Sequence, residues 1–311
     1  GYPGYAIALD GDGDAIELGG SPSPLASLSA WTIEAWIRPD SFGGAQAIYT
    51  ENIAISNGAA GMVLGLGLLD RQLVVGGWSD TEQSSWAWTE ATVPGEVAPA
   101  TWFHVAAVRS GSTVEIIVNG NPLTTTSTGA SAWTSLSSAV PSTFYVGRAG
   151  NPGEASYFRG QIDDVRLWTT ARTSNQVSTA RRQRLWGNET GLGTYLPMSG
   201  YPMTSVDGRG TSVPNMVSGS QTGLLRGGVR FVASGAGIVL PPTPYQLALA
   251  SSSDSGTIGD RITNAAVATV IGVAEAGSSV TLYRNGIALS PNVIAGPDGT
   301  FNVNAPLPSD G

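Results

Sequence analysis

The sequence predicts an all-β protein built from a large β-sandwich and a smaller one. Short runs rich in β-branched and aromatic residues alternate between apolar and polar positions, and Gly, Pro, Asn and Ser separate them. Helical periodicity is nearly absent. Of the 311 residues, 41% are hydrophobic and 12% are charged, which is typical of a chain that buries a sizeable core.

The strands of the large sandwich are expected in seven runs, at 31–39, 61–68, 71–78, 102–109, 113–120, 143–148 and 160–168. In the first run, alternation places Trp31 and Ile33 on one face and Glu34 and Trp36 on the other. One helix is expected over 171–186, with Thr173 or Ser174 as its N-cap.

The stretch LDGDGDAIEL, residues 9–18, places three aspartates in five positions. An EF-hand that began at Asp10 would need Gly at its sixth position and Glu at its twelfth, where the sequence has Ala15 and Ser21. The EF-hand is therefore excluded. A tight turn between two strands and another kind of metal site both remain open.

Composition excludes several classes of protein. The net charge is −8 and all 15 basic residues are arginine, so nucleic acid is a poor partner. The basic run at 180–187 is interpreted as a solvated helical face. There is no cysteine, which excludes disulfides and thiolate catalysis, and a lone histidine, His104, cannot form an ordinary zinc site.

The sequence also favours an exported protein. No apolar run reaches the length needed for membrane insertion. The chain begins GYPGY, without methionine or a charged leader, which indicates a mature protein or an excised fragment. The lack of cysteine fits a bacterial exported protein or a cytosolic one. The Gly/Ser/Thr-rich, lysine-free composition favours an extracellular or bacterial cell-surface location.

Three motifs resemble the laminin-G-like, concanavalin A-like jelly-roll family: WTIEAWIRPD at 31–40, WFHVAAVRSGSTVEIIVNG at 102–120 and GQIDDVRLW at 160–168. The segment 187–231 resembles the glycine-rich tail that adds strands to this module. Together the resemblance covers residues 1–242. It implies a two-sheet jelly-roll sandwich.

A Pro-rich joint at 240–246 precedes a second region. Residues 253–311 resemble the bacterial Ig-like repeats of large adhesins, in which the pattern continues into a further strand. The expected second domain, 243–311, is therefore a smaller, incomplete Ig-like β-sandwich. A missing strand would leave a sheet edge open to pairing.

Both resemblances imply calcium (Ca2+). In the jelly roll, the family's metal position matches Asp10, Gly11, Asp14 and Asp163. Alternation places Asp163 on the face of Val165 and Leu167, where an inward carboxylate needs a cation or several donors. A cap on backbone N–H groups is the alternative for Asp163.

In the second domain, Asp254 and Asp260 resemble the interdomain calcium ligands of adhesin repeats. A polar turn is the alternative for these two residues.

The stretch 76–95 combines tryptophans with polar residues, and it is the expected ligand-binding region. Exposed indoles stack on the C–H faces of sugars, so Trp78, Trp86 and Trp88 are candidate glycan contacts, with Trp133 and Tyr157 from other loops. The alternative is a hairpin whose tryptophans cover the sandwich, since alternation puts Trp86 and Trp88 on one face.

Catalysis is not expected. No G-x-S-x-G nucleophile elbow occurs, and Glu34 lacks the partner motif of a glucanase. The resemblance makes His104 a structural position.

The expected function is a non-catalytic, calcium-stabilised module of a bacterial adhesin that binds glycan or another surface ligand. Two alternatives stay open. One is a filament or surface-layer subunit that pairs with copies of itself through sheet edges. The other is an accessory carbohydrate-binding domain of a larger enzyme.

Overall fold

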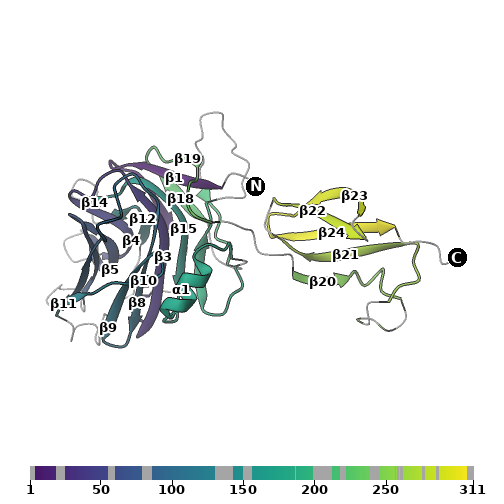
Figure 1. Ribbon diagram of the computed structural model, residues 1–311, viewed down its shortest axis with the longest axis horizontal. Coiled ribbons are helices and arrows are strands. Elements are labelled where there is room, and N and C mark those ends of the chain that lie inside the picture. Colours follow the sequence, from purple (N-terminus) through teal and green to yellow (C-terminus); the bar gives the residue numbers. More distant parts are fainter. Residues whose placement is uncertain are drawn as a thin grey trace. The chain divides into compact units, whose positions relative to one another are not determined.

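The computed structural model describes residues 4–18, 25–54, 60–78, 86–129, 143–149, 156–185, 187–198, 212–217, 222–238, 245–255, 257, 259, 262–274, 277–284 and 287–306. Within these ranges the chain forms strands β1–β24 and one helix, α1 (Figure 1). It divides into two compact units: residues 1–199 with 203–239, and residues 200–202 with 240–311.

The first unit is a sandwich of two antiparallel sheets (Figure 1). The order in the first sheet is β10 (Asn121–Pro122), β9 (Thr113–Val118), β8 (Phe103–Ser110), β3 (Ala30–Pro39), β15 (Arg159–Trp168), β1 (Tyr5–Asp10) and β19 (Arg230–Ala233), and β16 (Leu192–Leu196) also pairs with β15.

The order in the second sheet is β11 (Thr126–Thr128), β7 (Trp86–Thr92), β6 (Gln72–Trp78), β5 (Ala60–Leu69), β4 (Ala45–Ala54), β12 (Thr143–Val146), β2 (Ala15–Leu18), β18 (Gly223–Arg226) and β17 (Ser212–Val213). The short strands β13 (Arg148–Ala149) and β14 (Ser156–Tyr157) pair with each other.

The core lies between these sheets and follows the predicted alternation. Trp31 and Ile33 of β3 are fully buried in it, together with side chains from β5, β8 and β12. All seven runs read from the sequence form strands, so the prediction of an all-β sandwich is confirmed. The runs at 45–54 and 86–92 are strands that the sequence patterns did not single out.

Helix α1 (Ser174–Ala180) is shorter than the expected helix over 171–186. Thr173, one of the two predicted N-caps, caps the helix and forms a capping box with Gln176. Val177 packs on the outer face of the first sheet, against β8 and β9. The interpretation of 180–187 as a solvated helical face is wrong in part: the helix ends at Ala180, and Arg184 is buried.

The second unit contains a three-stranded sheet and a hairpin. The sheet has the order β20 (Tyr245–Leu249), β21 (Val267–Val273) and β24 (Thr300–Pro306), and the hairpin is β22 (Ser279–Arg284) with β23 (Ile287–Ile294). Along β24, Phe301, Val303 and Ala305 are buried and the residues between them are exposed, which is the pattern of a half-buried strand. The Ig-like assignment of this unit stays a prediction.

Candidate functional site

Strand β7 presents aromatic and polar side chains on the outer face of the second sheet. Ala87 and Ala91 are buried in the core, so alternation places Trp86, Trp88 and Glu90 on the opposite face. Trp86 is 42% exposed and Trp88 is half-buried. These tryptophans share one face, as alternation predicts, and they do not fill the core.

The indole of Trp88 is held in place from two directions. Its neighbour on β6 is Gly76, and a Cβ added at Gly76 would lie 2.7 Å from Cε3 of Trp88. The ring therefore lies directly against the glycine backbone. Its Nε1–H donates a hydrogen bond to Oε2 of Glu90, at 3.0 Å. Glycine at position 76 is required because any side chain there would displace the ring.

The register extends this position across the sheet. Trp88 lies beside Thr128 on β11 and beside Gly76 on β6. Gly76 pairs with Gly65 on β5, and Gly65 pairs with Thr50 on β4. At this level the outer side of the sheet thus has an indole next to two glycines, with the exposed Thr128 on one side and the buried Thr50 on the other.

Tyr157 belongs to a second aromatic group, at the β13–β14 pair. The Arg148 guanidinium carbon lies 4.7 Å from the ring centroid of Tyr145 and 5.9 Å from that of Tyr157. Thr50 Oγ1 donates to the carbonyl oxygen of Arg148 at 2.7 Å, which ties this pair to β4. Because β4 and β7 are three strand spacings apart, about 14 Å, Tyr157 and Trp88 form separate groups.

Two other predicted ligand contacts are described incompletely or not at all. Trp78 pairs with Trp86 in the β6–β7 register, but its side chain lies outside the described residues, as does all of Trp133.

In the first turn, carboxylates bind backbone N–H groups. Oδ2 of Asp14 accepts a hydrogen bond from Asp10 N at 3.0 Å, and Oδ1 of Asp14 accepts one from Gly228 N. Oδ1 of Asp10 accepts from Asp12 N at 2.8 Å. Gly11 adopts a φ of +84°, which glycine favours in such a turn. Burial raises the pKa of Asp14, although the hydrogen bonds from the backbone N–H groups of Asp10 and Gly228 oppose this rise.

The inward orientation expected for Asp163 is wrong because β15 carries a bulge. Ile162, Val165 and Leu167 all lie in the core, and the register with β3 shifts between Asp163 and Arg166. Asp164 has a φ of +53° at this bulge. The extra residue turns both aspartates off the core face. Oδ2 of Asp163 accepts from Ser234 Oγ at 2.6 Å, and burial raises the pKa of Asp163 to about 7.

The register also separates the residues of the expected jelly-roll calcium site. Ile7 pairs with Ile162 and Asp10 with Arg159, so Asp163 is next to the level of Ala6. Asp10 lies four residues further along β1, about 13 Å from that level, whereas calcium holds its ligands at about 2.3–2.6 Å. Asp163 therefore does not fit a site shared with Asp10, Gly11 and Asp14.

In the second unit, Oδ2 of Asp254 accepts a hydrogen bond from Gly259 N at 2.6 Å, which matches the polar-turn alternative. Asp260 lies outside the described residues. Within the described part of the chain, no group of three or more His, Cys, Asp or Glu side chains is arranged to hold a metal ion. Calcium binding stays a prediction.

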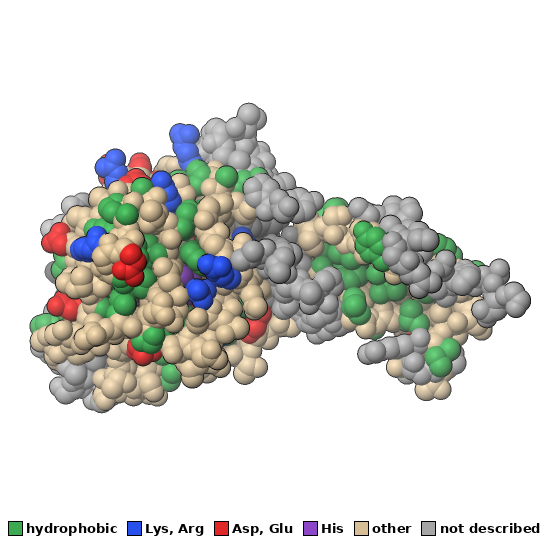
Figure 2. All heavy atoms as spheres, in the orientation of Figure 1, with side chains coloured by type: hydrophobic (Ala, Val, Ile, Leu, Met, Phe, Trp, Pro, Cys, Tyr) green, Lys and Arg blue, Asp and Glu red, His purple; other side chains and the backbone are tan. Residues whose placement is uncertain are grey.

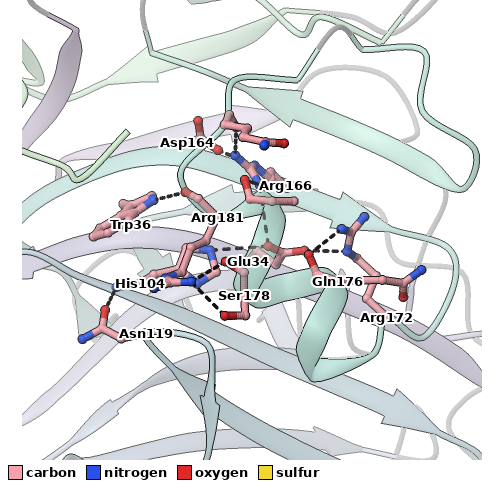
Figure 3. A network of polar contacts seen from close by, with 12 residues as sticks. Glu34, Trp36, His104, Asn119, Asp164, Arg166, Arg172, Gln176, Ser178 and Arg181 are labelled. Atoms are coloured by element: carbon pink, nitrogen blue, oxygen red, sulfur yellow. Dashed lines mark hydrogen bonds and ion pairs between the residues drawn. The ribbon is translucent and has the colours of Figure 1, made fainter. Parts of the chain in front are cut away.

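A buried charge network lies between the first sheet and α1 (Figure 3). It consists of Glu34 on β3, His104 on β8, Asp164 and Arg166 on β15, and Arg172. Oε2 of Glu34 lies 3.4 Å from His104 Nε2 and 3.8 Å from Arg166 Nη1, and Oε1 lies 3.2 Å from Arg172 Nε. Arg166 Nε donates to Oδ1 of Asp164.

The network fastens α1 to the sheet. Arg166 Nη1 donates to the carbonyl oxygen of Ala180 at 3.0 Å, and Trp36 Nε1 donates to that of Arg181 at 2.7 Å. These donors satisfy carbonyl groups at the C-terminal end of α1, which have no partner within the helix. On the outside, Figure 2 shows basic side chains gathered over α1, where Arg182 is exposed.

Burial and charge set the protonation states in the network. Burial opposes ionisation of Glu34, but His104, Arg166 and Arg172 outweigh it, so the pKa of Glu34 is lowered. Burial lowers the pKa of His104, which favours neutral imidazole. Glu34 and His104 are both fully buried, so neither side chain lies on the surface of the first unit. The family resemblance implied a structural position for His104, but no sequence pattern indicated its pairing with Glu34.

Comparison with known proteins places the first unit in a family. The model of the concanavalin A-like lectin/glucanases superfamily matches residues 10–178, more than half of the chain. The chain belongs to this superfamily. The family assignment confirms the jelly-roll resemblance, while the comparisons leave the Ig-like resemblance untested. No curated protein matches the chain by sequence.

One solved structure supports the fold, and two others are similar at lower TM-scores. A candidate carbohydrate-binding protein from Bacteroides ovatus has a TM-score of 0.52 at 21% identity, and the match covers 76% of this chain and 61% of that one. A SAP-like pentraxin from Limulus polyphemus has a TM-score of 0.46 at 18% identity, covering 76% and 98%.

The CBM40 of a Ruminococcus gnavus sialidase, bound to α2,3-sialyllactose, has a TM-score of 0.40 at 11% identity, covering 55% and 95%. Only the first of these three TM-scores is high enough to support a shared fold.

Within the described residues, α1 is neither long nor apolar enough to cross a membrane.

Proposed function

We propose that this concanavalin A-like domain is a non-catalytic glycan-binding module whose contact surface is the outer face of β7. The observation that carries the proposal is the fixed indole of Trp88, which lies against Gly76 and donates its N–H to Glu90. A ring fixed in this way loses little conformational freedom when a ligand stacks on it.

The surroundings of Trp88 match the amphipathic chemistry of a sugar. A sugar ring offers C–H groups to an indole face and hydroxyl groups to polar side chains. Thr126 and Thr128, both exposed on the edge strand β11, lie beside Glu90 and Trp88. Apolar and hydrogen-bonding groups therefore occur next to each other on this face.

The proposed setting is a bacterial surface protein. The lysine-free, acidic composition and the region after residue 242 that resembles adhesin repeats support an extracellular adhesin. The similarity in fold to a candidate carbohydrate-binding protein of Bacteroides ovatus agrees with glycan recognition. The alternative of an accessory domain in a larger enzyme would use the same surface.

A glycan array, followed by isothermal titration with the selected glycan, tests the proposal. The unchanged protein binds, and Trp88→Ala loses at least about tenfold in affinity, which corresponds to about 1.4 kcal/mol. Gly76→Ala has a similar effect, because the added methyl group displaces the indole.

The matched control is Leu224→Ala on β18. Leu224 is a 38% exposed hydrophobic residue on the outer face of the same sheet, far from β7, and its replacement leaves the affinity unchanged. No binding to any arrayed glycan, or full binding by Trp88→Ala, would refute the proposal.

A further inference from the structure

We propose that β7 binds an uncharged, linear glycan chain along its length, with one sugar ring on Trp88 and the next ring on Trp86. This inference rests on the proposed function and specifies its ligand class. A site of this kind binds internal segments of a glycan chain rather than single terminal sugars.

The spacing of the two indoles supports two successive subsites. Trp86 and Trp88 are separated by one residue on the same strand and face, so their Cα atoms lie about 6.6 Å apart. That distance is comparable with the advance of a linear glycan from one ring to the next. Trp86 is 42% exposed, so its ring is accessible beside that of Trp88.

The two ends of β7 differ in chemistry, so a glycan bound along the strand would have a preferred direction. Trp86 and Trp88 are followed on the same face by Glu90 and Thr92, so the aromatic positions lie at one end and the hydrogen-bonding positions at the other. Thr126 and Thr128 on β11 repeat the polar character beside Glu90 and Trp88. A chain along β7 therefore meets stacking and hydrogen-bonding groups in sequence.

Charge favours a neutral ligand. The Glu90 side chain lies 3.0 Å from Trp88 Nε1, directly beside the proposed subsite, and the protein carries a net charge of −8. A carboxylate on a sugar at this subsite would be repelled by like charge.

The test is isothermal titration with neutral cello-, xylo-, manno- and malto-oligosaccharides of one to six rings. The unchanged protein gains about tenfold in affinity for at least one series between one ring and three. Trp86→Ala removes this gain and keeps the single-ring affinity, whereas Trp86→Phe retains part of the gain. Leu224→Ala is the control.

Two further results bear on the inference. A gain with chain length that survives Trp86→Ala, or single rings that bind as tightly as chains, overturns the inference while leaving glycan binding intact. Glu90→Gln keeps an acceptor for Trp88 Nε1 and raises the affinity for oligogalacturonic acids relative to the affinity for neutral chains. An acidic chain that already binds the unchanged protein as tightly as a neutral one overturns the charge preference. No binding to any glycan in this set or on the array refutes the proposed function itself.

Discussion

Arg166 is the residue on which the buried network depends most. It carries the positive charge between Asp164 and Glu34, and it donates to the carbonyl oxygen of Ala180. Burial opposes its charge, but Asp164 and Glu34 outweigh burial and raise its pKa further. Removing this one side chain would leave Asp164 buried without its ion-pair partner and would take one of three partners from Glu34.

Arg166→Met is therefore expected to lower the free energy of unfolding by about 3–5 kcal/mol, the cost of breaking a buried ion pair. Denaturation by urea, followed by near-ultraviolet circular dichroism, measures the change. The control is Arg182→Met, which removes an exposed arginine just after α1 and is expected to change stability by less than about 0.5 kcal/mol. Equal losses in both variants would show that the network contributes no stability.

Glu51 gives a second prediction, on pH. Its carboxyl group is buried in the core and accepts hydrogen bonds from Leu25 N, Ala26 N and Tyr49 Oη, at 2.7, 2.9 and 3.0 Å. Burial raises its pKa from 4.5 to about 7. Since the folded state holds the proton more tightly than the unfolded state, this group stabilises most below about pH 4.5, and the stabilisation is lost as pH rises through about 7.

Glu51→Gln removes this titration. The stability of the unchanged protein minus that of the variant is expected to fall by about 3 kcal/mol between about pH 4.5 and pH 7. Urea denaturation across this range measures the difference, with Glu96→Gln as an exposed control. The comparison between proteins is needed because other buried groups, such as Asp163 and His104, also titrate. A difference that does not vary with pH would contradict the prediction.

At the scale of elements, the capping box of helix α1 determines where the helix begins and contributes to stability. Thr173 Oγ1 accepts from Gln176 N at 3.2 Å, and the Gln176 side chain accepts from Thr173 N at 2.8 Å. Thr173→Ala is expected to cost about 1 kcal/mol of stability. Thermal unfolding measures it against Thr179→Ala, an exposed position in the last turn. No loss relative to that control would mean that tertiary contacts alone hold α1.

Alternation in the sequence was sufficient to predict seven strands of the large sandwich. It placed Trp31 and Ile33 on one face, which the structure shows to be the core face, and it placed Trp86 and Trp88 on one face, because side chains of a strand alternate with period two. It failed at β15, where Asp164 at the bulge reverses the faces for the residues before it. A single inserted residue leaves no compositional signal, so only the observed register reveals it.

The candidate site was predicted in part for similar reasons. The tryptophans of 76–95 were singled out by their polar surroundings, but the contact of Trp88 with Gly76 depends on cross-strand register. The network of Glu34, His104 and Arg166 joins three strands that are distant in sequence. Local patterns carry no information on such pairings, so no motif could have identified them.

At the scale of the molecule, the two units differ in what they offer a ligand. All nine tryptophans precede residue 187 and so belong to the sequence of the first unit. The second unit has exposed hydrophobic residues of other types, including Ile262, Tyr283 and Ile294. If glycan binding depends on indoles, it must occur on the first unit.

The most direct test of glycan binding at β7 is nuclear magnetic resonance of the tryptophan side chains, labelled with ¹⁵N at the indole. The spectra are recorded while the glycan selected on the array is added. The Nε1–H signals of Trp88 and Trp86, assigned with single Trp→Phe variants, are expected to shift and to saturate with the ligand. The signals of Trp31 and Trp168, which are buried, should not move. Saturated binding that leaves the Trp88 and Trp86 signals unchanged would contradict the account.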